Sequence, residues 1–80
     1  MIELFYSDNC PYCKKVIDYL ESNYIKYIPK NINNPEYYNE LLRTGGISQV
    51  PFMFDRNNGK ALYESDKIIS YLKIPGEHNT

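Results

Sequence analysis

Two cysteines in the run Cys10-Pro11-Tyr12-Cys13 constrain the fold of this chain more than any other feature. The run follows a short apolar stretch, Ile2 to Tyr6, and opens a segment with helical periodicity. Apolar side chains recur there at the spacing of one helix face: Tyr12, Val16, Ile17, Tyr19, Leu20 and Tyr24. The cysteines are therefore expected between a buried strand and the first turn of an amphipathic helix over residues 12–23.

The next segments predict a second strand and a second helix. Residues 24–28 alternate and are closed by Pro29, which is typical of a strand end. Asn34 is a natural N-cap, Pro35 suits the first helical position, and Gly45-Gly46 interrupts the helical pattern that follows. A strand, a helix and a strand in this order predict a right-handed βαβ unit.

The last third of the chain predicts a hairpin and a final helix. Apolar runs at 51–54 and 61–63 flank Asn58-Gly59, which is a strong turn signal. Ser65 is placed to cap a helix that ends at Pro75-Gly76. The order βαβ-α-ββ-α predicts an α/β fold with a four-stranded mixed sheet flanked by three helices, which matches the thioredoxin-like fold in its minimal form.

Length and charge exclude several classes of function. At 80 residues the chain holds one domain, expected over residues 1–76 with a flexible tail at 77–80. A net charge of -1 offers no dedicated nucleic-acid surface, and no apolar run approaches the roughly 20 residues of a membrane span. The first residues lack the pattern of a signal peptide, so we expect a cytoplasmic protein in a reducing compartment.

The cysteine spacing predicts redox chemistry. Cys10 is expected beside a helix N-terminus, where unpaired N–H groups and the helix dipole stabilise a thiolate. Cys13 lies one turn later, close enough to attack a mixed disulfide on Cys10 and release the substrate thiol. A structural disulfide here would contribute only about 2 kcal/mol. A zinc site would lack ligands, because His78 is the only other soft candidate.

Three motifs, taken in order, resemble the active-site elements of the dithiol glutaredoxins. They are Cys10-Pro11-Tyr12-Cys13, Gln49-Val50-Pro51 and Glu64-Ser65-Asp66. The resemblance spans nearly the whole chain, and the first motif is a strong marker by itself. It implies a glutaredoxin domain in which Cys10 and Cys13 are catalytic and glutathione is the reducing co-substrate.

The resemblance also implies a glutathione groove around the cysteines. Its residues would be Tyr12, Gln49, Val50, Pro51, Ser65 and Asp66. The peptide bond before Pro51 is expected to be cis, with the backbone of Val50 pairing with the tripeptide like an added strand. The residues alone leave an alternative, an ordinary trans proline that opens an edge strand.

The γ-glutamyl end of glutathione is implied to lie at the start of the last helix. The hydroxyl of Ser65 and the helix N-terminus suit its carboxylate, and Asp66 suits its amino group. Helix capping by Ser65, with Asp66 favouring the dipole, explains the same residues without a ligand. Tyr12 either contributes to the groove or packs over the first helix.

Two departures from the family pattern stand out. Many glutaredoxins carry a lysine or arginine shortly before the first cysteine, whereas Ser7-Asp8-Asn9 stands here and Asp8 is expected to repel an anionic tripeptide. Lys30 and Arg43 are candidate partners for the glycyl carboxylate, or else solvated surface charges. Leu62-Tyr63 replaces a frequent Gly-Gly, which makes this segment similar to the N-terminal domain of glutathione transferases as well.

The expected function is glutathione-dependent reduction of protein disulfides and of glutathione mixed disulfides by a monomer. It needs no metal and no tightly bound cofactor, because the sulfurs carry the electrons. An electron-donor role, for example to ribonucleotide reductase, fits the same chemistry, with thioredoxin reductase as a rival source of electrons. The alternative class is a glutathione-binding module or an iron–sulfur carrier ligated by Cys10 and glutathione.

Overall fold

Seven elements follow one another in residues 1–74, the part of the chain that the computed structural model describes. They are β1 (Ile2–Tyr6), α1 (Pro11–Ser22), β2 (Tyr27–Asn31), α2 (Pro35–Gly45), β3 (Phe52–Asp55), β4 (Lys60–Tyr63) and α3 (Ser65–Leu72). This is the predicted order. The expected domain end at residue 76 and the tail at 77–80 lie outside the described residues.

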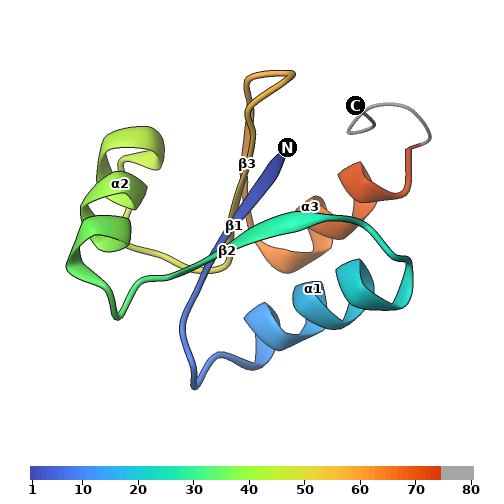
Figure 1. The fold of residues 1–80 in the computed structure, drawn as a ribbon, viewed down its shortest axis with the longest axis horizontal. Helices are drawn as coiled ribbons and strands as arrows, with labels where there is room; N and C mark the ends of the chain where they lie inside the picture. The colour runs from blue at the N-terminus through green and yellow to red at the C-terminus, as the bar shows by residue number, and fades with distance from the viewer. Residues whose placement is uncertain (75–80) are drawn as a thin grey trace.

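The four strands form one mixed sheet in the order β2-β1-β3-β4. β1 runs parallel to β2 and antiparallel to β3, and β3 runs antiparallel to β4. Helix α2 lies on one side of the sheet, and α1 and α3 lie together on the other (Figure 1). This arrangement confirms the predicted fold class.

Alternate side chains of β1 supply two separate cores. Ile2 and Leu4 join the larger core, under α1 and α3, with Val16, Leu20, Met53, Ile68, Tyr71 and Leu72. Phe5 points to the opposite face, where it packs with Leu41 of α2 and Phe52 of β3. Burial of each such side chain stabilises the fold by about 1.5–3 kcal/mol, so the central strand is anchored from both faces.

The second strand lies three residues later than predicted. Tyr24, which the alternation placed in the strand, has a φ of 55° in the turn after α1. Pro29, expected to close the strand, lies within β2 opposite Leu4. The prediction was wrong because β2 is an edge strand, where a residue that lacks an N–H group costs the sheet no hydrogen bond on its open side.

The predicted cap is confirmed for α2 and wrong for α3. Asn34 accepts a hydrogen bond from the N–H of Glu36 at 3.0 Å, and Gly46 ends α2 with a φ of 85°. Ser65, by contrast, is a buried residue inside the first turn of α3. Only Glu64 separates β4 from α3, so this residue takes the cap position with a φ of 72° and no capping bond from its side chain.

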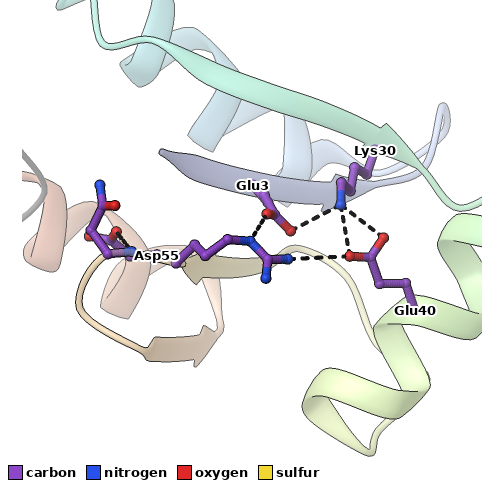
Figure 2. Close-up of polar contacts among 6 residues, drawn as sticks. Glu3, Lys30, Glu40 and Asp55 are labelled. Atoms are coloured by element: carbon purple, nitrogen blue, oxygen red, sulfur yellow. Dashed lines mark hydrogen bonds and ion pairs between the residues drawn. The ribbon is translucent and has the colours of Figure 1, made fainter. Parts of the chain in front are cut away.

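A buried ion network fixes α2 to the sheet (Figure 2). Glu3 of β1 is 4% exposed, and its carboxylate accepts hydrogen bonds from Lys30 at 3.0 Å and Arg56 at 2.7 Å. Glu40 of α2 accepts from Lys30 at 2.8 Å and lies 3.7 Å from the guanidinium of Arg56. The two acids and two bases therefore neutralise one another across β1, β2, α2 and the hairpin turn.

Two buried carboxylates are more acidic in the fold than in water. Burial acts to raise the pKa of Glu3, but the hydrogen bonds from Arg56 and Lys30 outweigh it and hold the pKa below its usual value. Asp55 is fully buried, and the hydroxyl of Tyr71 donates to it at 2.6 Å. Burial likewise acts to raise the pKa of Asp55, and its hydrogen bonds, that from Tyr71 foremost, lower it on balance.

We expect acid to destabilise the fold through both carboxylates. Their pKa values are lower folded than unfolded, so their contribution is complete above the unfolded values near 4 and is lost as the pH falls through the folded values. Glu3→Gln should lower the free energy of unfolding by about 3 kcal/mol at neutral pH, because Lys30 and Arg56 lose a charged partner. It should also flatten the acid dependence. Urea unfolding at a series of pH values measures both effects.

Asp18→Asn is the matched control for this prediction. Asp18 forms an exposed ion pair with Lys14 at 3.3 Å, and such pairs contribute about 0.5 kcal/mol or less. An acid profile that is as steep in Glu3→Gln as in the wild type would contradict the role given to Glu3.

Candidate active site

Four segments emerge at one edge of the sheet because of how the strands pair. Tyr6 at the end of β1 pairs with Asn31 at the end of β2. Phe5 lies opposite Phe52 at the start of β3, and Phe52 lies opposite Tyr63 at the end of β4. The segments brought to this edge are 7–13, 31–34, 49–51 and 64–66. Pairing register thus gathers all three predicted motifs, which are far apart in the sequence.

Cys10 and Cys13 form a disulfide at the start of α1. Cys10 is the N-cap residue, and its Sγ accepts a hydrogen bond from the backbone N–H of Cys13 at 3.0 Å. Cys10 is partly exposed, whereas Cys13 is 1% exposed. In the reduced form the same N–H and the helix N-terminus favour a thiolate at Cys10. An attacking Cys10 and a sheltered, resolving Cys13 require this arrangement.

The predicted groove residues next to the cysteines differ in exposure. The ring of Tyr12 is 67% exposed in the first turn of α1, so most of its surface is open to a ligand. The Val50–Pro51 peptide bond is cis, as the resemblance implied. Pro51 is buried, Val50 packs against the α2-side core, and Gln49 is exposed with its N–H bonded to the carbonyl of Ile47 at 2.9 Å.

The start of α3 lies within reach of α1. The carboxylate of Asp66 pairs with the ammonium of Lys15 at 3.1 Å, and both side chains are largely exposed. Ser65 beside it is buried. The residue expected to hold an amino group thus already holds one from its own chain. An exposed pair of this kind contributes at most about 1 kcal/mol, so a ligand can replace Lys15 at small cost.

The two cations predicted for the glycyl carboxylate lie elsewhere. Lys30 is bound by Glu3 and Glu40, and its side chain is only 11% exposed. Burial acts to lower the pKa of Lys30, but the hydrogen bonds to Glu40 and Glu3 raise it on balance, so it stays charged within the network. Arg43, in the last turn of α2, borders a separate hollow with Glu36.

Tyr63 is a site residue that the sequence did not reveal. Its hydroxyl donates to the carbonyl of Ile47 at 2.8 Å and accepts from the N–H of the same residue at 3.1 Å. Its ring lies 4.5 Å from that of Phe52. Gly45 makes room for it, because a Cβ there would overlap the Tyr63 hydroxyl. One side chain of β4 therefore holds the segment that leads to Val50 and Pro51.

A second tyrosine holds the same segment from α2. The hydroxyls of Tyr38 and Ser48 share a hydrogen bond of 3.0 Å. The signal for the first contact was present, since Tyr63 stands where the family often has glycine. Its meaning was hidden, because the partner is the backbone of Ile47, whose identity carries no information about the contact.

Within residues 1–74, no three His, Cys, Asp or Glu side chains gather as a metal site would require. His78, the extra ligand considered for zinc, lies outside these residues. None of the helices described combines the length and hydropathy needed to cross a bilayer.

Comparison with known proteins agrees with the geometry. A family model described as Glutaredoxin matches residues 2–58, which include both cysteines and the cis proline. No curated protein matches the chain.

Solved structures share the fold at low sequence identity. A mutant of the thioredoxin-like protein BC3987 has a TM-score of 0.78 at 21% identity, with 91% of this chain and 100% of that one covered. The glutaredoxin from Archaeoglobus fulgidus has a TM-score of 0.72 at 15% identity, with 91% and 86% covered. A buckwheat glutaredoxin in complex with glutathione has a TM-score of 0.70 at 20% identity, with 96% and 71% covered.

Tyr63→Phe tests the tether. We expect the free energy of unfolding to fall by about 1 kcal/mol, because two hydrogen bonds are lost at a partly exposed site. Amide hydrogen exchange at Ile47 should rise by at least about tenfold, since its N–H loses its acceptor.

Tyr27→Phe is the control for this prediction, because it removes a hydroxyl bound to Glu21 at 2.9 Å, far from the sheet edge. Exchange at Ile47 that rises equally in both variants would refute a specific tether.

Proposed function

We propose that this chain, which belongs to the glutaredoxin family and is a thiol–disulfide oxidoreductase, uses glutathione to restore its Cys10/Cys13 dithiol. The observation that carries the proposal is the shared sheet edge. There the disulfide, the backbone at Val50 and the start of α3 at Ser65 emerge together. A tripeptide needs this set: a sulfur partner, an extended backbone to pair with and a helix N-terminus for a carboxylate.

The reaction has two branches. With a glutathione mixed disulfide, the Cys10 thiolate attacks the glutathione sulfur and releases the protein thiolate; a second glutathione then forms glutathione disulfide and frees Cys10. With a protein disulfide, Cys10 forms a mixed disulfide with the substrate and Cys13 displaces the second substrate thiol. This leaves the Cys10–Cys13 disulfide seen in the structure, which two glutathiones reduce.

The groove around the sulfurs supports these roles. Tyr12 presents an exposed ring beside Cys10, and Gln49, Val50 and Pro51 form the opposite wall in our proposal. Asp66 exchanges Lys15 for the γ-glutamyl amino group. The buckwheat glutaredoxin of similar fold binds glutathione in its own complex, which supports the same co-substrate here.

The proposed partners are glutathione and proteins that carry disulfides or bound glutathione. The protein acts as a monomer in the cytoplasm, where a reducing thiol pool keeps the cycle turning. An electron-donor role toward ribonucleotide reductase belongs to the dithiol branch.

Serine substitutions separate the two branches. We expect Cys10→Ser to reduce turnover of a glutathione mixed disulfide to background, because the nucleophile is lost. Cys13→Ser should keep this turnover and lose the reduction of protein disulfides, which needs the second thiol. An assay coupled to glutathione reductase measures both reactions. Equal rates in wild type, Cys10→Ser and Cys13→Ser would refute the mechanism.

Calorimetry tests glutathione recognition without turnover. In a Cys13→Ser background, we expect Asp66→Asn to weaken glutathione binding by about fivefold, the equivalent of one exposed ion pair. Asp18→Asn in the same background removes an equal charge from α1 and should leave the affinity unchanged. If the parent variant binds no glutathione at all, the assignment of this co-substrate fails.

A further inference from the structure

A hollow beside the dithiol is not used by the glutathione assignment. It has a volume of about 440 Å³ and lies between the segment that follows β1, the end of β2 and α2. Asp8 and Asn9 line it, and Asn9 directly precedes Cys10. A group in this hollow is therefore next to the reacting sulfur, on the α2 side of the sheet edge.

The walls of the hollow are held in place by hydrogen bonds. The side-chain N–H of Asn31 donates to the carboxylate of Asp8 at 2.9 Å. The side-chain oxygen of Asn31 in turn accepts from the backbone N–H of Asn33 at 2.9 Å, which fixes the orientation of the amide. Tyr38, on the far wall, is tied to Ser48 at 3.0 Å. Asp8 is thus positioned at the wall rather than free in solvent.

The charge of Asp8 is not balanced inside the hollow. Among the described residues that line it, none is basic. Lys30, on the neighbouring strand, is bound by Glu3 and Glu40. Lys15, on the other side of the dithiol, is paired with Asp66. The hollow therefore offers one carboxylate and several side-chain oxygens as acceptors, a set that suits an ammonium or a guanidinium group.

We propose that this hollow binds a lysine or arginine side chain located near the disulfide of a protein substrate, with Asp8 as the specificity-determining residue. The inference rests on the proposed thiol–disulfide reaction and not on its use of glutathione. The same charge disfavours a carboxylate in the hollow, so basic segments react with Cys10 faster than acidic ones.

Matched peptides test the charge preference. Each carries one cysteine as a mixed disulfide with thionitrobenzoate, and they differ only in a lysine or a glutamate beside that cysteine. The reduced protein, freed of reductant, reacts in a single turnover. The Cys10 thiolate attacks the peptide sulfur and displaces coloured thionitrobenzoate. Cys13 then releases the peptide thiol, so the dithiol supplies both electrons and ends as the disulfide.

We expect the lysine peptide to release thionitrobenzoate about three- to fivefold faster than the glutamate peptide at low salt, the range of one exposed charge pair. At about 1 M salt the Debye length is about 3 Å, and the difference should disappear. Asp8→Asn should abolish the preference and Asp8→Lys should reverse it. Asp18→Asn changes the net charge equally and should keep it.

Three results would overturn the proposal: equal rates for the two peptides with wild-type protein, a preference that survives Asp8→Asn, or one that Asp18→Asn also removes. Equal rates leave the redox function intact, since both peptides still react. Release of thionitrobenzoate from neither peptide refutes both this proposal and the thiol–disulfide function on which it rests.

Discussion

The buried carboxylate of Glu3 is the constraint on which the rest of the fold depends. It lies in the central strand, between the parallel edge strand and the antiparallel hairpin, and it accepts hydrogen bonds from Lys30 and Arg56. Glu40 shares both cations and so ties α2 to the sheet. Because an isolated charge is costly to bury, the carboxylate demands that β2, the hairpin turn and α2 all take their places together.

The positions of these elements create the site at the opposite end of β1. With the register of β1 set against both neighbours, the segments that follow β1, β2 and β4 and the one that precedes β3 share one edge of the sheet. Cys10 then lies at the N-terminus of α1, and Tyr63 holds Ile47. Structural charge and redox chemistry occupy different ends of the same strand, so the network keeps Lys30 away from the dithiol.

Charge around the dithiol is distributed unevenly, and this gives the site a direction. On the α3 side, Asp66 is paired with Lys15 in an exposed contact that a ligand can exchange. On the α2 side, Asp8 has only the neutral amide of Asn31 as its hydrogen-bond partner among the interactions described. A zwitterionic γ-glutamyl end suits the first side, and a cationic side chain suits the second. Glutathione and a basic protein segment are thus recognised at different places around one nucleophile.

The sequence by itself determined the features that depend on local pattern. Helical periodicity, the Asn34 cap, the Asn58-Gly59 turn signal and the Cys10/Cys13 spacing act over a few residues, so they predict elements and their order without knowledge of the fold. The cis bond at Pro51 was also expected, through family resemblance.

Tertiary structure alone decided the rest. Pro29 lies inside β2 only because that strand is at the sheet edge, and Ser65 became a buried first-turn residue because a single residue joins β4 to α3. The partners of Lys30, Asp8 and Tyr63 are distant in sequence and are set by strand register. Contacts of this kind follow from long-range packing, which no local pattern records.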